Sequence, residues 1–552
     1  MSPAKKNKLR IVPLGGMGEI GKNMTVFEYG DDIFVLDCGS MFPSESMLGI
    51  DLVIPDISYL ILNKDRIRAF VISHGHEDHI GALPYILKEV QAPIYGTRIT
   101  LALIENKLNE HGVKADLRCV SAGDTLHFGC FVIELIKTTH SIAGALALAI
   151  HTPVGIVVHT GDFKIDFTPI DTEGVNLAKF AQLGEQGVLC LMSDSTNVER
   201  PGYTMSERSV GEAFERYFKK AKGRIIVATF ASNIHRVQQV IDTALRFGRK
   251  VCFQGRSMIN IASMALELGD MTIDESMMID VEQTDNIPPD QVVIITTGSQ
   301  GEPMSGLVRM ATSGHRIDIE PDDMIIISAT PIPGNEKFVS NVVNQLYRKG
   351  ATVIYESLAD VHVSGHACQE ELKIILSLTK PRYFIPVHGE YRHLYRHGEL
   401  AESMGVPKEN VFVLDIGNVI ELDESEADRG ASVAAGSVMV DGLGIGDVGN
   451  IVLRDRRILS QDGLFVVVLA MSRQDNALVG VPDIISRGFV YVRESEDLIE
   501  DAKSVICDTI NDMELEHADW NAIKNSVRAA LRDYLYNKTK RNPMILPIIV
   551  EV

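Results

Sequence analysis

The densest group of metal-binding side chains in this sequence is the segment His74-Gly75-His76-Glu77-Asp78-His79. Imidazole and carboxylate ligands in this mixture suit zinc or manganese, whereas a purely structural zinc site favours thiolates. A turn can direct alternate side chains to two sides, so His74 and His76 can bind one ion while Asp78 and His79 bind a second. Surface histidines beside a helix are the plainer alternative, but the complete H-x-H-x-D-H pattern favours a metal site.

The segments that flank this motif predict how it is held. Residues Arg68 to Ile72 form an apolar run that predicts a buried strand. The residues after the motif have the spacing of a helix, with apolar side chains at Ile80, Leu83, Leu87 and Val90. The candidate ligands therefore lie in a strand-to-helix turn.

Further polar residues stand where other apolar runs end. His140, Asp162 and His388 each follow a short run that predicts a strand. Taken singly, such a residue is more often a turn or capping residue, but together with the histidine segment these three complete two coordination spheres. Asp37 and Asp194 also stand at the ends of strand-like runs, and a carboxylate placed like Asp37 can orient a metal ligand through a hydrogen bond.

Length and composition indicate a soluble protein of several domains. A chain of 552 residues is too long for one core and predicts two or three domains. Apolar residues make up 45% and charged residues 23%, which is ordinary for a globular protein. The sequence has no apolar run of about 18 residues and no signal peptide at its start, so we expect a cytoplasmic location. Seven cysteines without a C-x-x-C pair indicate reduced core residues.

The formal net charge of −21 bears on nucleic-acid binding. It argues against non-specific attachment through a globally basic surface. Bound dications with a local cluster of histidine and arginine can still make one cleft positive. The charge therefore leaves a focused phosphate site open.

The segment Gly16-Met17-Gly18-Glu19-Ile20-Gly21 matches the G-x-G-x-x-G pattern of dinucleotide-binding proteins. That fingerprint requires a helix to follow, because the amino end of the helix holds a pyrophosphate. Here Met24–Tyr29 alternates like a strand, and a second strand-like run follows at Ile33–Leu36 after a turn. We therefore predict a hairpin and reject dinucleotide binding.

The chain changes character between about residues 206 and 355. Short strand-like runs alternate there with helical spacing, which predicts a mostly parallel sheet. The predicted helices cover residues 210–221 and 235–247, and the predicted strands cover 224–229, 250–253, 292–295 and 324–328. Because His388 lies beyond this stretch, we expect the α/β unit to be inserted into the metal-binding domain.

An acidic run at residues 421–430 and a glycine-rich stretch at 441–446 precede a third unit. That unit begins near Asn450. Its predicted strands cover residues 464–469, 488–492 and 545–550, and its predicted helices cover 497–512 and 520–535. It holds no catalytic constellation, so we assign it an oligomerisation or accessory role.

The assembled candidate ligands resemble those of the metallo-β-lactamase superfamily: His74, His76, Asp78, His79, His140, Asp162 and His388. Asp194, His366 and His388 are similar to the three motifs of its β-CASP branch, which acts on nucleic acids, and histidine at the third motif is typical of RNA-acting members. Along essentially its whole length the chain is similar to the bacterial ribonuclease J family. The resemblance implies an α/β fold: an αββα sandwich with an inserted β-CASP α/β domain and a small C-terminal α+β domain.

The resemblance also implies domain limits and a role for each site residue. The sandwich would comprise residues 1–205 and 361–420, the β-CASP domain 206–360, a linker 421–450 and the C-terminal domain 451–552. One divalent cation, Zn²⁺ or Mn²⁺, would be held by His74, His76, His140 and Asp162, and a second by Asp78, His79, Asp162 and His388. Asp37 and Asp194 would support these ligands. Every metal ligand is present, so we expect a catalytically intact member.

Other positions correspond to family sites for the substrate and for a structural ion. The substrate phosphate would be held by Ala231, Ser232, Asn233, His362, Val363, Ser364, Gly365 and His366. A structural cation, Ca²⁺, would lie near Gly49, Asp51 and Asp441.

The implied function is a metal-dependent ribonuclease that acts in RNA processing and decay as a 5′-to-3′ exonuclease and endonuclease. Two metals would activate a hydroxide to attack an RNA phosphodiester. Asp78 or Asp162 would accept the proton, and His366 would contact the scissile phosphate or the leaving oxygen. The expected partners are single-stranded RNA with a 5′-monophosphate and further copies in a homodimer or homotetramer. A paralogous subunit or other RNA-decay enzymes would also be partners. No interaction with a membrane is expected.

Other function classes remain as alternatives at this stage. The same sandwich serves hydrolases of small esters, thioesters, lactones or lactams, but these need neither the α/β insertion nor His366. A non-catalytic RNA-binding scaffold is the other alternative, and it would be unaffected by chelation.

Overall fold

The computed structural model describes residues 7–170, 173–301, 304–332, 335–356, 360–472, 477–490, 495–513 and 519–552. The described chain divides into one compact unit of residues up to Phe42 with Leu52–Val438, and another of Pro43–Asp51 with Met439–Val552. Among the described residues, no helix has the length and apolar character that crossing a bilayer requires. The first unit carries all the candidate metal ligands.

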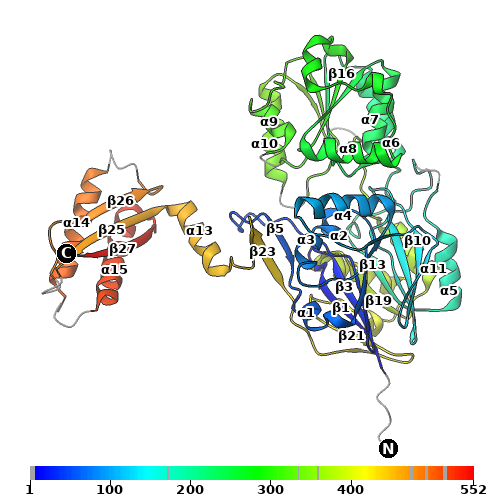
Figure 1. Ribbon diagram of the computed structural model, residues 1–552, viewed down its shortest axis with the longest axis horizontal. Coiled ribbons are helices and arrows are strands. Elements are labelled where there is room, and N and C mark those ends of the chain that lie inside the picture. Colours follow the sequence, from blue (N-terminus) through cyan, green and yellow to red (C-terminus); the bar gives the residue numbers. More distant parts are fainter. Residues whose placement is uncertain are drawn as a thin grey trace, which may run out of the picture. The chain divides into compact units, whose positions relative to one another are not determined.

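One β-sheet packs face to face against another in this first unit (Figure 1). The first sheet has the order β22-β21-β1-β3-β4-β6-β7-β8: β1 (Leu9–Gly15), β3 (Met24–Tyr29), β4 (Asp32–Leu36), β6 (Ile67–Val71), β7 (Ile94–Gly96), β8 (Leu117–Cys119), β21 (Ile420–Leu422) and β22 (Ala427–Arg429). The second has the order β19-β13-β12-β11-β10-β9: β9 (Thr125–Phe128), β10 (Phe131–Lys137), β11 (Leu146–Thr152), β12 (Gly155–His159), β13 (Val188–Asp194) and β19 (Tyr383–Val387). Between the sheets, the rings of Phe27 and Phe34 stack with centroids 4.9 Å apart.

Helices cover the outer faces of these sheets. The second sheet is covered by α5 (Leu177–Gln186), α11 (Gln369–Thr379) and α12 (Tyr391–Ser403). The first sheet is accompanied by α1 (Ser58–Leu62), α2 (Glu77–Ile80), α3 (Leu83–Ile86) and α4 (Arg98–Glu110). In β11, Leu148 and Ile150 face the other sheet while Ala147 and Ala149 face the helices, so the strand is apolar throughout because both its faces are covered. The expected αββα sandwich is confirmed.

The inserted α/β domain has the order β15-β16-β14-β17-β18 in its sheet, and neighbouring strands are parallel, as predicted. Its strands are β14 (Ile225–Ala228), β15 (Lys250–Gln254), β16 (Val292–Thr296), β17 (Met324–Ile327) and β18 (Thr352–Ile354). Its helices are α6 (Arg208–Phe218), α7 (Ile234–Arg246), α8 (Arg256–Leu268), α9 (Gly306–Ala311) and α10 (Glu336–Arg348) (Figure 1). One apolar core lies on each face of the sheet.

The glycine-rich segment at residues 16–21 combines bends with a short strand, and β3 and β4 form the predicted hairpin after it. The short β2 (Met17–Gly18) pairs with β20 (Gly389–Glu390). The backbone N–H of His388 donates a hydrogen bond to the carbonyl of Gly16 at 2.9 Å. The segment that resembles a dinucleotide fingerprint therefore supports the backbone of a candidate metal ligand.

The second unit holds a sheet in the order β26-β25-β27 with helices packed on one face. Its elements are β25 (Leu464–Met471), β26 (Asp483–Arg487), β27 (Met544–Glu551), α13 (Asn450–Asp462), α14 (Glu496–Asn511) and α15 (Trp520–Thr539). A separate small sheet has the order β24-β23-β5: β5 (Leu52–Pro55), β23 (Ser437–Asp441) and β24 (Gly444–Ile445). The strand predicted at 488–492 is wrong for its described residues 488–490, because the strand lies at Asp483–Arg487; residues 491 and 492 lie outside the described residues.

Both chain connections of the inserted domain meet at one buried arginine. Arg236 of α7 has no exposed surface. Its Nε donates to Glu207, just before α6, at 2.5 Å, and its Nη1 donates to the Ser328 hydroxyl at 2.7 Å and to the carbonyl of Val361 at 3.4 Å. The guanidinium thus ties the segment that enters the domain to the segment that leaves it.

Replacing this buried cation tests that role. Arg236→Met would remove the hydrogen-bonded partner of the buried Glu207 carboxylate and leave only Lys164, 3.8 Å away, as its cationic neighbour. We therefore expect the free energy of unfolding to fall by about 3–5 kcal/mol, measured by urea denaturation. Arg246→Met removes an ion pair with Glu215 whose side chains are 66% and 46% exposed, and should cost less than about 1 kcal/mol. Equal losses in the two variants would contradict the role assigned to Arg236.

Candidate metal centre

Three imidazoles face one another on one side of the candidate centre. Nε2 of His74 and Nε2 of His140 each lie 3.1 Å from Nδ1 of His76. In a tetrahedral site with metal–nitrogen distances of about 2.0–2.1 Å, ligand nitrogens are about 3.3 Å apart. The three nitrogens therefore have the spacing of ligands in one coordination sphere.

A second group combines carboxylates with imidazoles: Asp78, His79, Asp162 and His388. Nε2 of His388 lies 3.1 Å from Oδ2 of Asp78, and Nε2 of His79 lies 3.3 Å from Oδ2 of Asp162. Oδ2 of Asp162 is also 3.9 Å from Nε2 of both His74 and His140. The Asp162 carboxylate therefore stands between the two groups.

His366 and Asp194 adjoin this second group. Nδ1 of His366 lies 2.8 Å from Oδ2 of Asp194 and 3.9 Å from Oδ2 of Asp162. The ring of His366 stacks on that of His388 with centroids 5.3 Å apart. The structure thus brings His366 to the centre from a loop of the chain that leaves the inserted domain.

The ends of parallel strands explain why residues so distant in sequence meet. Asp162, Asp194 and His388 follow or end β12, β13 and β19, which are parallel neighbours in one sheet. Asp37 and the segment that begins at His74 follow β4 and β6, which are parallel neighbours in the other sheet. Because the carboxyl ends of parallel strands share an edge, the side chains at those ends gather there.

Four of the five candidate ligand imidazoles, all except His76, are also held from behind through their second nitrogen. For His74 this contact joins Nδ1 to the Ser73 hydroxyl at 3.0 Å. Nδ1 of His79 lies 2.8 Å from the carboxylate of Asp37, a residue in the left-handed region with a φ of 61°. Nδ1 of His140 donates to the carbonyl of Gly365 at 2.8 Å, which leaves Nε2 free to bind a metal. Nδ1 of His388 lies 2.8 Å from the Thr196 hydroxyl. The predicted orienting role of Asp37 matches this contact, whereas Thr196 and the Gly365 carbonyl carry no signal in the sequence.

Burial sets the charge of the imidazoles. It lowers the pKa of His76 to about 4 and, together with the neighbouring imidazoles, holds the pKa of His74 and His140 well below the ordinary value. Burial opposes protonation of His79 and His388 as well, but the adjoining carboxylates outweigh it and raise their pKa. Neutral imidazole is the form that binds metals, so the first group is ready for a cation. A donor set of buried imidazoles and carboxylates fits zinc or manganese.

Comparison with known proteins decides the family. Family models match the metallo-beta-lactamase superfamily over residues 17–207, the ribonuclease J beta-CASP domain over 222–346, the Zn-dependent metallo-hydrolase RNA specificity domain over 351–414 and the ribonuclease J C-terminal domain over 451–552. Ribonuclease J2 of Bacillus subtilis is 45% identical over 99% of this chain and 100% of its own length. Ribonuclease J of Thermus thermophilus is 45% identical over 99% and 96% of the two chains, and ribonuclease J 1 of Streptococcus pyogenes 43% over 99% and 98%. The chain belongs to the ribonuclease J family.

Membership of the ribonuclease J family confirms the resemblance seen in the sequence. The fold is also shared with a solved structure, a protein of unknown function from Enterococcus faecalis V583. That structure gives a TM-score of 0.55 at 18% identity, covering 75% of this chain and 100% of that one.

One of the two loops expected to hold substrate in this ribonuclease J family member, His362 to His366, lies beside the centre. The Ser364 hydroxyl accepts a hydrogen bond from Asn197 at 2.8 Å, and a side chain at Gly365 would meet the ring of His140 at 2.6 Å. Nδ1 of His362 is buried without a hydrogen-bond partner among the described residues. Burial, with nearby cationic side chains, lowers its pKa to about 3. The side chain of Asn233 caps α7. The contacts of these loops with substrate stay predictions.

The expected structural-cation residues lie in the second unit. Asp51 accepts a hydrogen bond from the backbone N–H of Gly442 at 2.7 Å, and Asp441 forms an ion pair with Arg456. Arg456 also donates to the Leu48 carbonyl at 2.9 Å and passes so close to Gly49 that a side chain there would meet it at 2.7 Å. A cation near Gly49, Asp51 and Asp441 stays a prediction.

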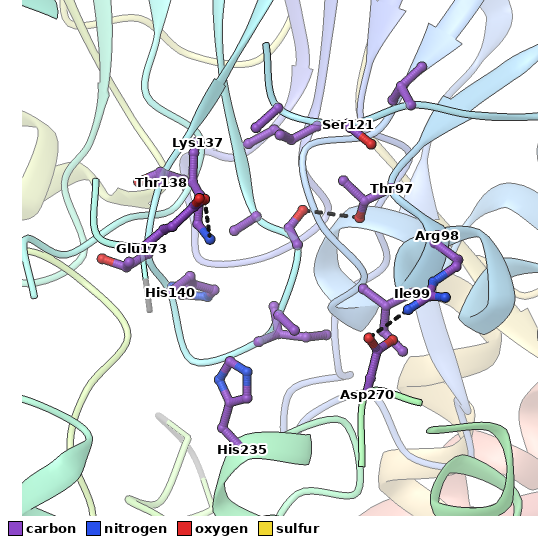
Figure 2. Close-up of a pocket in the computed structure, with 18 residues that line it drawn as sticks. Thr97, Arg98, Ile99, Ser121, Lys137, Thr138, His140, Glu173, His235 and Asp270 are labelled. Atoms are coloured by element: carbon purple, nitrogen blue, oxygen red, sulfur yellow. Dashed lines mark hydrogen bonds and ion pairs between the residues drawn. The ribbon is translucent and has the colours of Figure 1, made fainter. Parts of the chain in front are cut away.

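A cavity of about 360 Å³ opens beside His140 (Figure 2). The sandwich lines it with residues that include Thr97 and Lys137, and the inserted domain lines it with His235 and Asp270. Arg98 of α4 forms an ion pair with Asp270 at 2.9 Å at this junction. His140 thus borders both the candidate ligand group and an open cavity.

The contact between Asp37 and His79 yields a test of the centre. Asp37→Asn keeps the shape of the side chain but removes the charge that orients His79, so we expect zinc affinity to fall about 10- to 100-fold. Competition with a coloured chelator would measure it. Asp31→Asn, in the exposed turn between β3 and β4, is the matched control and should bind zinc like the unaltered protein. Unchanged affinity in Asp37→Asn would rule out its orienting role.

Proposed function

We propose that this protein is a metal-dependent ribonuclease that hydrolyses RNA phosphodiesters, both from the 5′ end and internally. The observation that carries the proposal is the meeting of two ligand groups at Asp162, within a chain of the ribonuclease J family. The RNA specificity domain model that matches residues 351–414 supports RNA as the substrate. The match favours this function over hydrolysis of small esters or lactams.

The proposed ligands divide into the groups seen in the structure. One divalent cation would be held by His74, His76, His140 and Asp162, and a second by Asp78, His79, Asp162 and His388. Zn²⁺ or Mn²⁺ suits these ligands. When bound, such a pair lowers the pKa of water and neutralises the charge that develops on a phosphoryl group.

The residues of the chain itself would complete the reaction. His366, whose ring is oriented by Asp194 at 2.8 Å, is placed to hydrogen-bond the scissile phosphate or the leaving oxygen. Asp78 or Asp162 would accept the proton of the attacking water. The Ser364 hydroxyl and the backbone near Gly365 would offer neutral donors to phosphate, as loops of small residues do.

The substrate ends are part of the same proposal. A 5′-monophosphate would lie among Ala231, Ser232, Asn233 and the loop from His362 to His366, which gives exonuclease action in the 5′-to-3′ direction. The cavity beside His140 leaves room past the centre, which suits internal cuts. Single-stranded RNA is the form that such a junction between domains accommodates.

The arrangement of the whole chain follows from the family. We propose the domain limits 1–205 with 361–420, 206–360, 421–450 and 451–552, a cytoplasmic location, and assembly into a homodimer or homotetramer, with a paralogous subunit or other RNA-decay enzymes as further partners. The structural Ca²⁺ near Gly49, Asp51 and Asp441 belongs to the same set of proposals.

RNA labelled at a 5′-monophosphate tests the function directly. The purified protein with manganese should release labelled mononucleotide and, from longer RNA, internal fragments. Chelation should abolish both products, and added manganese or zinc should restore them. His76→Ala should fold normally and yield no cleavage, because it removes a ligand of one group without touching the core. Cleavage that persists through chelation, or in His76→Ala, would refute the metal-dependent mechanism.

His366→Ala separates a role in the reaction from a role in metal binding. Because His366 adjoins the centre but belongs to neither proposed set of metal ligands, we expect kcat to fall by about 100-fold or more while metal content stays the same. Single-turnover cleavage and metal analysis of the same sample would measure the two effects. Loss of metal in this variant would show that His366 is itself a ligand.

A further inference from the structure

A hollow of about 340 Å³ lies between the loop after β12 and the loop before α6. Its lining combines exposed aromatic rings with hydroxyl groups. Phe167 is 70% exposed and Tyr203 is 56% exposed. Thr168, Thr204 and Ser206 contribute the hydroxyls. Two open aromatic side chains thus line one hollow.

Hydrogen bonds fix the two loops to each other. The Ser206 hydroxyl donates to the carbonyl of Thr168 at 2.9 Å, and the buried Nζ of Lys164 donates to the carbonyl of Met205 at 3.3 Å. The backbone N–H of Glu207 donates to the carboxylate of Asp166 at 3.1 Å. The hollow is therefore held in shape before anything binds, which reduces the conformational entropy that these loops would lose on binding.

The same loops connect the hollow to the metal centre. Asp162, which stands between the two ligand groups, lies five positions before Phe167. The Thr204 hydroxyl donates to the carbonyl of His366 at 2.7 Å, and the ring of His366 contacts Asp194. The hollow thus borders the loop proposed to hold the scissile phosphate.

We propose that this hollow binds a base of the single-stranded RNA substrate, stacked on Phe167 or Tyr203. This inference rests on the proposed ribonuclease function. Every base has an aromatic face, so stacking suits an enzyme that must accept any sequence. Arg200, three residues before Tyr203, is exposed and adds a positive charge to the same segment of the chain, which would attract a phosphate of the strand. The hydroxyl oxygens of Thr204 and Ser206, whose hydrogens are donated to carbonyls, can still accept hydrogen bonds from base amino groups.

Aromatic substitutions give the first test. Phe167→Ala and Tyr203→Ala should each weaken binding of single-stranded RNA about 5- to 150-fold, which is the usual effect of losing one stacked base. The loss should appear as a higher KM, with unchanged metal content. Phe167→Trp should restore affinity and Phe167→Leu should not, because leucine keeps apolar surface but has no aromatic face. Tyr347→Ala, at a residue of α10 that is 49% exposed, is the control and should bind RNA normally.

Tryptophan fluorescence distinguishes stacking of a base on residue 167 from a merely structural role of that residue. The chain has one tryptophan, Trp520, so Phe167→Trp in a Trp520→Phe background reports on the hollow alone. With His76→Ala added to prevent cleavage, intact RNA should quench the fluorescence. RNA with an abasic site at the stacked position should not quench it.

The outcomes separate this inference from the function on which it rests. Equal quenching by intact and abasic RNA, or RNA affinity unchanged in both alanine variants, would overturn the stacking site even if the unaltered protein cleaves RNA. Absence of RNA cleavage by the metal-loaded, unaltered protein would refute the proposed function, whatever the fluorescence shows.

Discussion

Concentrating buried ionisable groups at one edge of the sandwich is the constraint on which the rest of the structure depends. His74, His79, Asp162 and His388 are each at most 3% exposed, and an isolated buried charge or unpaired polar group is costly. Two arrangements offset that cost: the imidazoles of His74, His79, His140 and His388 are bonded from behind, and carboxylates lie among the imidazoles at the centre. The nitrogens of the first group still face one another at about hydrogen-bond distance, an arrangement that a shared cation relieves.

Such a cluster requires a rigid frame. The strands that deliver it are covered on both faces, so they cannot tilt or slip without exposing apolar surface on one side and opening the core on the other. The inserted domain is joined to this frame at the same edge. Arg236 fixes its two connections, and Asn197 holds the Ser364 loop against the centre. A substrate that contacts both the inserted domain and the metal-binding residues would therefore meet a surface whose backbone can move little.

The sequence was sufficient to predict those site residues that are of a rare type and also stand at the end of a predicted strand. The histidine segment, His140, Asp162 and His388 all have that signature, and the structure brings them together. The contacts of Thr196, Ser73 and the Gly365 carbonyl could not be predicted, because hydroxyls and backbone carbonyls occur everywhere and act here only through tertiary neighbours.

In the fold, too, some helices and strands could be predicted from the sequence and others could not. Strands and helices with a covered face were predictable from their apolar spacing. The helix α13 was not, because none of its residues is buried and no apolar stripe marks it. The misplaced strand near residue 488 has a local cause: Gly488 takes a φ of 69°, which ends the strand, while Phe489 turns into the helix-facing core and imitates a strand residue. The ion pair between Arg456 and Asp441 depends on how the folded chain brings the two residues together, and the spacing of residues in the sequence does not predict it.

The acidity of the chain bears on how an RNA substrate would be held. With a net charge of −21, the general surface repels phosphates, so attachment through scattered lysines cannot supply the affinity. Under the proposed function, affinity would instead come from local contacts: cations at the buried centre, Arg200, the neutral donors of the Ser364 loop and contacts with the bases. An RNA strand would therefore be held where it reaches the metal centre rather than across the general surface.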